Sequence, residues 1–497
     1  MADPVLTRIP VPSGKTETLD TADMQGLVAR AYGNLPFARY VLCRVGDPAA
    51  ARAWLAGVAG DVFTADRPES GGPCLNLAFT WVGLRRLGLA EDALATFPRP
   101  LQEGMVTPHR SRILGDHGDS DPARWRFGGP GAGAGGDIDV LIMLFASTAA
   151  ALGAEHADRR SAYEGSGALV ELGAPIDGLL MDGHEHFGFA DGLSQPIVRG
   201  WPSGGASVRP PAPAPPVPGR FVEVAPGEIL LGYRDNFGKP AEGPTVTDRG
   251  PAQRLAPAPW AKGRRDLGRN GSFLVFRQLA QDVAAFRRSL EEAAQAAGTR
   301  GVALDPEHIG AKMVGRWKSG ASIVTHPDRD PGEVGGNDFG YHDEDQDGLR
   351  CPLGAHVRRA NPRDSSEDKP GEALRSTLNH RILRRGRPYG PPLTDPPDPG
   401  AEDVERGLVF MCLNTDIERQ FEFVQHTWIN NPSFAGLGGE VDPAVGPQPD
   451  DGGSFTVPAQ GVRRNLTSLP RFVTTRGGAY FFLPSVRALT YLATLTG

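Results

Sequence analysis

The chain has 497 residues, 39% of them hydrophobic and 22% charged, as is usual for a globular protein of two domains. Its net charge of −7 argues against a nucleic-acid partner, because nucleic acid requires a basic face. The longest apolar stretch, 140–154, is too short to span a bilayer, which argues against a membrane partner.

Strand and helix patterns alternate along the first half of the chain. Residues 38–46 read as a strand that leads into a helix, and 75–89 and 139–160 repeat this order. A further short strand is expected within 168–176. Elements of this length with short connections predict a split βαβ unit, as in a ferredoxin-like sandwich.

The same alternation returns after residue 270. SFLVFRQL precedes the helical pattern QDVAAFRRSLEEAAQ, RGLVFMCLN precedes DIERQFEFVQHTW, and GGAYFFLPS leads into a last helix. The sequence therefore predicts an α+β fold of two ferredoxin-like domains, in which antiparallel sheets pack with helices.

The domain boundary is expected where prolines are densest. We predict an N-terminal domain over residues 1–201, a Pro-rich linker over 202–221 and a C-terminal domain over 222–497. The stretches 326–378 and 431–462 are predicted to be long loops, and such loops in a compact protein usually carry function.

The N-terminal segment and the cysteines both bear on the compartment. The N-terminal segment shows neither the apolar core nor the twin arginines of an export signal. The four cysteines lie far apart and form no CxxC pair, which makes a disulfide framework or a structural zinc site unexpected. We expect a cytoplasmic protein.

The first segment with chemical potential is HEHFGFADGLSQPIV (184–198). Gly188 and Gly192 bracket Asp191, so the loop is free to turn tightly and to aim the carboxylate. The alternative is a turn aspartate that bonds its own backbone.

The second segment is CPLGAHVRRANPR (351–363). A lone histidine such as His356 is more often a core residue than a ligand, and partners for a protein-only metal site are absent at i+3 and i+4. A haem iron needs only one protein ligand, and the arginines Arg358, Arg359 and Arg363 would suit haem propionates. A third segment, NHRILRRGRPYG (379–390), carries four arginines that are either functional or a solvated basic face.

Taken together, these segments resemble dye-decolorizing (DyP-type) haem peroxidases over roughly the whole chain, most closely the larger, signal-less bacterial subgroup. Gly188-Phe-Ala-Asp191-Gly192 resembles the GxxDG motif with the distal aspartate. CPLGAHVRRANPR is similar to the segment with the proximal histidine, His356. ILRRGRPYG resembles the segment of the distal arginine, which falls on Arg384 rather than on Arg381 or Arg385.

Three more segments match in order. RGLVFMCLNTDIERQFEFVQHTW resembles the stretch that roofs the haem, and 226–238 and 477–485 also agree. The resemblance implies a dimeric α+β-barrel type of architecture, with the haem mainly in the C-terminal domain. The residues implied to hold the haem are His356 as the axial iron ligand, with Arg363, Leu408, Phe410 and Gly192.

The implied cofactor is one non-covalent haem b per chain, since no CxxCH attachment motif exists. The implied reaction is reduction of H₂O₂ through an oxo-ferryl intermediate, with Asp191 and Arg384 as catalytic residues. Dyes, phenols and similar aromatic compounds would be the reductants, and the protein would be a monomer or homodimer. A carboxylate base predicts an optimum at roughly pH 4 to 5.5. The acidic partner of His356 would be Asp442 or Glu440.

Parts of the sequence are also compatible with other functions. A haem carrier or iron-releasing protein, or a haem-free interaction protein, can share the fold. His184 with His186 forms only a weak metal motif, and residues 343–348 (DEDQDG) mimic a Ca²⁺ loop but lack its final glutamate, so we expect an acidic surface loop. Trp428 or Tyr389 would either relay electrons at the surface or fill the core.

Overall fold

The computed structural model describes residues 17–69, 72–130, 138–201, 223–298, 305–333, 336–337, 339–366, 369–394, 400–458 and 463–496. The predicted linker 202–221 lies outside the described residues, so the domain boundary stays a prediction. No helix within the described residues is both long and apolar enough to cross a membrane.

One antiparallel sheet organises the described chain. It has ten strands, and eight of them run in the order β11 (Leu383–Arg384), β13 (Gly407–Asn414), β10 (Ser272–Gln281), β16 (Val473–Leu483), β2 (Cys74–Phe79), β3 (Val140–Ala146), β1 (Phe37–Val45) and β4 (Leu169–Glu171). Off this path, β12 (Arg387–Tyr389) pairs with β13, and β5 (Ile176–Leu179) pairs with β1. The α+β class and the predicted strands are confirmed, and the strands of both halves join in a single sheet.

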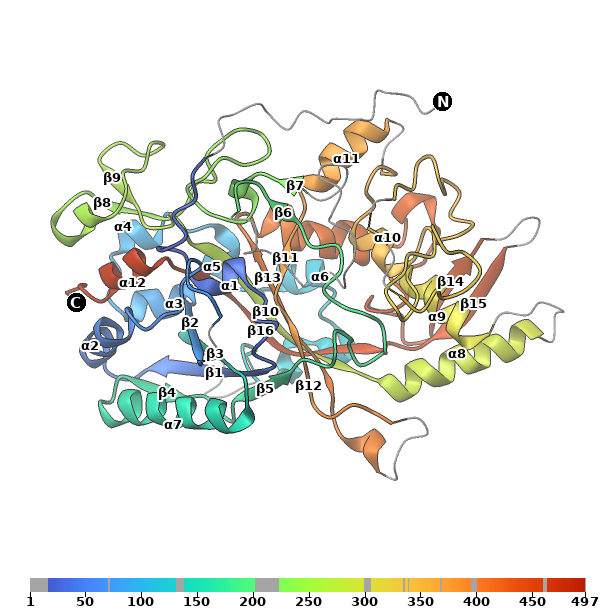
Figure 1. Cartoon of the computed structure of the whole chain (residues 1–497), viewed down its shortest axis with the longest axis horizontal. Helices are drawn as coiled ribbons and strands as arrows, with labels where there is room; N and C mark the ends of the chain where they lie inside the picture. Colours follow the sequence, from blue (N-terminus) through green and yellow to red (C-terminus); the bar gives the residue numbers. More distant parts are fainter. Residues whose placement is uncertain are drawn as a thin grey trace.

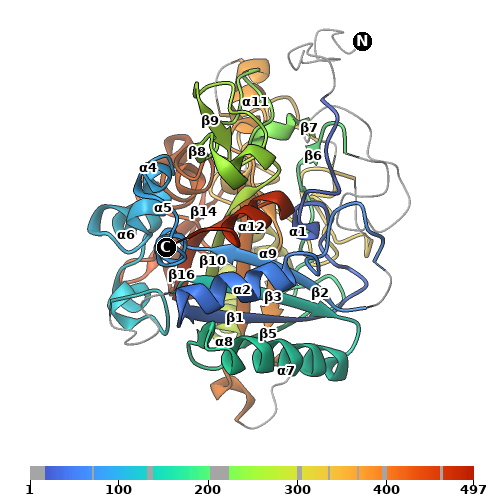
Figure 2. The same ribbon diagram turned by 90° about the vertical axis from the view of Figure 1, so that its left-hand side faces the viewer.

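Helices and small ribbons surround this sheet (Figures 1 and 2). The helices are α1 (Gly26–Ala29), α2 (Pro48–Val58), α3 (Trp81–Arg86), α4 (Glu91–Leu94), α5 (Arg99–Glu103), α6 (Pro108–Leu114), α7 (Ala149–Gly165), α8 (Val283–Gly298), α9 (Pro306–Val314), α10 (His356–Ala360), α11 (Pro370–Leu378) and α12 (Val486–Leu492). Short 3₁₀ turns lie at Gly118–Ser120, Pro122–Arg124, Pro226–Glu228, Gly250–Arg254, Ala401–Asp403 and Phe434–Gly436. The minor strands are β6 (Ile197–Val198), β7 (Glu223–Val224), β8 (Thr245–Thr247), β9 (Arg264–Asp266), β14 (Gly453–Val457) and β15 (Arg464–Leu469).

Local sequence explains where the main helices start. Asp47 precedes α2, and its carboxylate accepts a hydrogen bond from Ala50 N at 2.7 Å, while Pro48 occupies the first helical turn, where no amide donor is needed. Thr148 caps α7 in the same way, accepting from Ala151 N at 3.1 Å.

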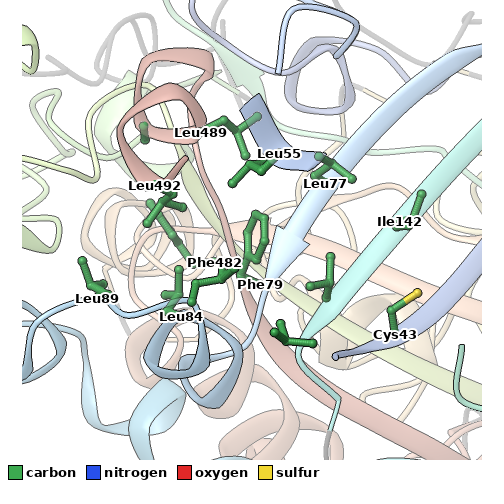
Figure 3. Close-up of a cluster of buried hydrophobic side chains, with 14 of the residues drawn as sticks. Cys43, Leu55, Leu77, Phe79, Leu84, Leu89, Ile142, Phe482, Leu489 and Leu492 are labelled. Carbon is green, nitrogen blue, oxygen red and sulfur yellow. The ribbon is translucent and has the colours of Figure 1, made fainter. Parts of the chain in front are cut away.

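The two halves meet where β16 pairs with β2, and there Phe482 lies opposite Phe79. Both rings are buried in an apolar cluster with Leu84, Leu489 and Leu492, which Figure 3 shows around the junction. Burying each such side chain contributes roughly 1.5–3 kcal/mol. The last helix, α12, lies beside α2 of the first half, so the C-terminal helix packs on the core of the first half (Figures 1 and 2).

Two predicted loop stretches contain more regular structure than expected. The stretch 326–378 includes α10 and α11, and 431–462 includes β14. The helical pattern after β13 folds as two π-helical segments, η8 (Glu418–Glu422) and η9 (Val424–Ile429). A π-helix is wider than an α-helix and is often found at functional sites. Its residues here line the cavity described below.

Candidate active site

A cavity of about 320 Å³ opens between the sheet face at β10 and β13, the helix α10 and the π-helical segments. Its volume lies within the range of about 300–1,000 Å³ usual for small-molecule sites. Apolar side chains such as Leu408, Phe410 and Val424 form much of the wall, and six arginines also line it: Arg277, Arg316, Arg363, Arg381, Arg384 and Arg471. Most of the lining residues come from beyond residue 222, as predicted for a site mainly in the second half.

His356 stands on one side of the cavity, at the first position of α10. Its Nδ1 lies 2.9 Å from Oδ2 of Asp442, whose side chain is fully buried, while the imidazole is 30% exposed. Burial lowers the pKa of His356, but the charge and hydrogen bond of Asp442 outweigh it and leave the pKa raised. Since Nδ1 is engaged, Nε2 is the nitrogen left to bind a ligand in the cavity.

Of the two acids proposed as partners of His356, Asp442 makes the contact. Its Oδ1 also accepts hydrogen bonds from Ala444 N and Val445 N, both at 2.9 Å. Burial raises the pKa of this carboxyl, yet His356, the amide of Val445 and the charge of Arg359 outweigh burial, so the pKa lies below its usual value. Glu440 instead accepts hydrogen bonds from the amide and hydroxyl of Thr456.

Asp191 and Arg384 form an ion pair that also lines the cavity. Nη1 of Arg384 lies 3.1 Å from Oδ1 of Asp191, and the two side chains are 35% and 32% exposed. Nη2 of Arg384 donates to Leu193 O at 2.8 Å, which fixes the guanidinium plane. The pair therefore presents an acceptor and a fixed cation side by side.

The glycines around Asp191 shape the loop. Gly188 and Gly192 have φ of +94° and +76°, in the region that favours glycine. The amide of Gly192 donates to Oδ1 of Asp191 at 2.6 Å. Gly192 is not among the described residues that line the cavity, and its contact with the cofactor stays a prediction. Its amide orients Asp191.

The neighbouring arginines of the predicted distal segment, Arg381 and Arg385, make other contacts. Arg385 is buried, and its guanidinium donates to Leu27 O at 2.8 Å and Val28 O at 2.9 Å. Arg381 lines the cavity and donates to Ser194 O, and it pairs with no carboxylate among the described residues. Geometry therefore favours Arg384 as the partner of Asp191.

Several buried arginines crowd one end of the cavity. Burial, followed by the charge of Arg363, lowers the pKa of Arg316 to about 10 and that of Arg381 to about 9. Arg363 lies 3.8 Å over the ring of Phe339 and donates to the carbonyl groups of Asn337 and Phe339. This repulsion among cations favours an anionic ligand at this end.

The structure places Arg358 and Arg359, which the sequence suggested for the haem propionates, away from the cavity. Both are buried and lie outside the cavity lining. Arg358 donates to Asp345 O and Cys351 O at 2.9 Å, and Arg359 donates to Glu440 O at 2.6 Å. They hold the surrounding backbone in place, and of the three basic residues only Arg363 reaches the site.

Leu408 and Phe410 of β13 line the cavity, and their place over the haem stays a prediction. Leu279 and Arg277 of β10 lie opposite these two residues in register, so all four side chains share one sheet face. Arg277 was not predicted as a site residue, although a charged residue inside the apolar strand SFLVFRQL is a signal in the sequence. Nor was Glu185, which lines the cavity and accepts hydrogen bonds from Phe187 N and Phe189 N.

Comparison with known proteins decides the family. No family model matches the chain. The chain is 32% identical over 445 residues to the dye-decolorizing peroxidase msp1 of Mycetinis scorodonius, which covers 84% of this chain and 75% of that protein. It is 32% identical over 378 residues to the multifunctional dye peroxidase DyP2 of an Amycolatopsis strain, with 71% of each chain covered.

The chain belongs to the dye-decolorizing peroxidase family.

Solved structures of the family share the fold. An ancestral D-type dye-decolorizing peroxidase matches with a TM-score of 0.71 at 29% identity, covering 95% of this chain and 99% of that chain. The DyP-type peroxidase from Auricularia auricula-judae matches with a TM-score of 0.73 at 25% identity, covering 96% and 100%. The protein is thus a haem peroxidase, an oxidoreductase that acts on hydrogen peroxide.

Other candidate features of this peroxidase have structural roles. His186 is buried with Nε2 2.8 Å from Tyr389 O, His184 is exposed, and no group of three metal-ligating side chains gathers within the described ranges. The stretch 343–348 is not simply an acidic surface loop, because Asp345 is buried and accepts hydrogen bonds from the amides of Arg350 and Cys351.

The two aromatic residues considered as surface relays are both buried. Trp428 and Tyr389 are each 7% exposed. Trp428 packs edge-on against His380 and Phe423, and the hydroxyl of Tyr389 donates to Glu405 at 3.0 Å. The alternative placement in the core is therefore correct.

Proposed function

We propose that this peroxidase would hold one non-covalent haem b through His356, and that Asp191 and Arg384 act on H₂O₂ in the same cavity. The observation that carries the proposal is the pairing within one cavity: His356 with Asp442 at 2.9 Å, and Arg384 with Asp191 at 3.1 Å. A haem carrier has no need of the Arg384–Asp191 pair. The presence of this pair therefore favours a catalytic function over a haem-carrier function.

The residues fit a haem. His356 has Nδ1 committed to Asp442, as is usual for a metal-bound histidine. Leu408 and Phe410 offer an apolar surface for the porphyrin plane. Arg363 belongs, with Arg316 and Arg381, to a cationic end of the cavity that suits two propionates.

Each residue has a defined task in the proposed reaction. Haem, when bound, supplies the two electrons that reduce the peroxide. Asp191 accepts a proton from one peroxide oxygen and delivers it to the other, so that water leaves. Arg384 holds the hydroperoxide and stabilises the negative charge that develops as the O–O bond breaks. Asp442 fixes the tautomer and orientation of His356.

Aromatic reductants complete the proposed cycle. One solved relative is a dye-decolorizing peroxidase in complex with 2,6-dimethoxyphenol, at 27% identity. We propose phenols and dyes as reductants here, with an acidic optimum. Four further properties remain predictions from the sequence. They are a monomeric or homodimeric state, a cytoplasmic location, the absence of nucleic-acid or membrane partners, and membership of the larger bacterial subgroup.

The test is an absorption spectrum of the haem-reconstituted protein before and after rapid mixing with one equivalent of H₂O₂. We expect the Soret band to fall and shift within milliseconds and to recover when a dye is added. The variant His356→Ala should lose most of its bound haem, whereas the matched variant His184→Ala, at an exposed histidine, should retain it. A stable Soret band that ignores peroxide would instead support a haem carrier.

A further inference from the structure

One corner of the cavity is unused by the proposed reaction. Asp116, Arg277 and Thr475 all line the cavity there. Nη2 of Arg277 donates to Oδ1 of Asp116 and, at 2.8 Å, to the hydroxyl of Thr475, which lies 3.3 Å from the same Oδ1. The three residues come from three separate parts of the chain: the turn after α6, β10 and β16.

The strand register places this corner on the same sheet face as the proposed peroxide site. Arg277 of β10 lies opposite Phe410, and Arg384 of β11 lies opposite Cys412. Phe410 and Cys412 are two residues apart on β13, so their side chains project from one face. Arg277 and Arg384 therefore flank β13 on that face, with Phe410 beside Arg277.

The next strand leaves room for the Arg277 side chain. Gly478 of β16 lies opposite Arg277 in register. A Cβ at this position would come within 3.2 Å of Cγ of Arg277 and 2.8 Å of the sulfur of Met105. The absence of a side chain at Gly478 therefore leaves space beside Arg277 and Met105.

Two polar atoms of this corner have no hydrogen-bond partner among the described residues. They are Oδ2 of Asp116 and Nε of Arg277, and each residue is only 4% exposed. Leaving a buried donor or acceptor unpaired costs about 1–3 kcal/mol, so such atoms call for a ligand or a water. One acceptor and one donor, from residues already bonded to each other, complement a hydroxyl group, which both donates and accepts.

We propose that this corner binds the hydroxyl group of a phenolic reductant, which donates to Oδ2 of Asp116 and accepts from Nε of Arg277. The inference rests on the proposed function, because the oxidant is the haem after its reaction with peroxide. In the step, the phenolic O–H bond breaks, its proton forms a new O–H bond on Asp116, and one electron passes to the oxidised cofactor. The products are a phenoxyl radical and a neutral Asp116, which then releases its proton to water.

The surroundings of Asp116 suit a proton acceptor. Burial raises the pKa of this carboxyl, and the opposing effects of Arg277, Thr475 and Arg471 do not cancel that rise. Arg471, from the turn before β16, also lines the cavity and donates to His117 O at 2.7 Å. The corner thus holds a carboxylate that takes up a proton more readily than an exposed one.

The test compares a donor that releases a proton with one that does not. For the holoenzyme we would measure kcat/KM for 2,6-dimethoxyphenol and for ferrocyanide, which gives up an electron alone. In Asp116→Asn, whose amide still accepts from Arg277 but takes no proton, the phenol-to-ferrocyanide ratio should fall at least tenfold. The matched control Asp119→Asn, at an exposed aspartate three residues away that pairs with Arg124, should keep the wild-type ratio.

A binding measurement adds a readout without turnover. By calorimetry, the resting wild-type holoenzyme should prefer 2,6-dimethoxyphenol over 1,3-dimethoxybenzene, which lacks the hydroxyl, and Asp116→Asn should reduce this preference several-fold. If the variant does not load haem, a crystal of the wild-type holoenzyme soaked with the phenol decides. The hydroxyl oxygen should lie within about 3 Å of Oδ2 of Asp116.

Two results would overturn the inference. One is a ratio and a binding preference that do not change in Asp116→Asn, and the other is a phenol seated elsewhere with a water at the corner. Failure of the proposed function looks different, since neither ferrocyanide nor phenol would then be oxidised by the wild-type protein in the presence of peroxide.

Discussion

Nδ1 of His356 and Oδ2 of Asp442 lie 2.9 Å apart, with the carboxylate fully buried behind an imidazole that reaches the cavity. A buried acceptor of this kind fixes the ring and makes the other nitrogen a stronger donor. We predict that Asp442→Asn weakens haem affinity or slows the reaction with peroxide about 10- to 100-fold. Haem titration and stopped-flow spectroscopy measure the two effects.

The matched control for this variant is Glu440→Gln. Glu440 lies two residues away and bonds Thr456 rather than His356, so its loss should leave haem affinity near the wild-type value. Equal losses in the two variants would show that the segment matters for its fold and not for the histidine contact.

Arg384 and Arg381 both line the cavity but are expected to have different roles. Arg384 pairs with Asp191, whereas Arg381 donates to Ser194 O. Removal of a preorganised donor to developing charge usually costs about 10²–10³ in rate. We predict such a loss in the peroxide step for Arg384→Leu, with haem still bound. Arg381→Leu removes a cation from the end of the cavity that suits an anionic ligand, so it should weaken haem binding but leave the peroxide step of the loaded protein near the wild-type rate. The opposite pattern would move the distal role to Arg381.

Gly192 offers a test of how Asp191 is oriented. Its amide donates to Oδ1 of Asp191 at 2.6 Å from a backbone with φ of +76°. An alanine in left-handed backbone costs about 1–2 kcal/mol, so the loop should shift to relieve it. We predict that Gly192→Ala slows the peroxide step roughly tenfold while the haem spectrum stays unchanged. Spectral loss of haem would show instead that Gly192 contacts the cofactor.

The sequence predicted the strands well because their apolar runs are long and bounded. It also marked Asp191, His356 and Arg384, since each sits in a distinctive local segment. It could not choose between Asp442 and Glu440, because which carboxylate faces His356 depends on the path of a long loop. Nor could it show that Phe79 and Phe482 join both halves into one sheet, because pairing across such a distance has no local signal.

The Asp116–Arg277 corner was missed for the same reason. Asp116 follows α6, and its partner lies in β10, so nothing in either local segment indicates the contact. Trp428 and Tyr389 illustrate the converse, since an aromatic residue in a sequence gives no measure of its depth. Local patterns therefore reveal which residues have chemistry, and the tertiary register reveals which of them act together.

A buried carboxyl far from the reaction makes stability depend on pH. Asp266 in β9 is 2% exposed, and burial raises its pKa from 3.8 to about 7 despite hydrogen bonds from the amides of Arg269 and Gly268. Between those two pH values the folded protein binds a proton that the unfolded chain has released. The contribution of Asp266 to the free energy of unfolding should therefore be most favourable below about pH 4. It should fall as the pH rises and level off above about pH 7.

The variant Asp266→Asn removes this dependence, because the amide is neutral at every pH and its oxygen can still accept from Arg269 N. The pKa rise from 3.8 to about 7 corresponds to at most about 4 kcal/mol, at about 1.4 kcal/mol per unit. Denaturant unfolding should show the variant more stable than wild type by up to that amount at pH 8, and by roughly 1.5 kcal/mol at pH 5. The control Asp248→Asn, at an exposed aspartate, should show no such trend. A gain in stability for Asp266→Asn that is equal at both pH values would mean that packing, and not the buried charge, destabilises the wild-type protein.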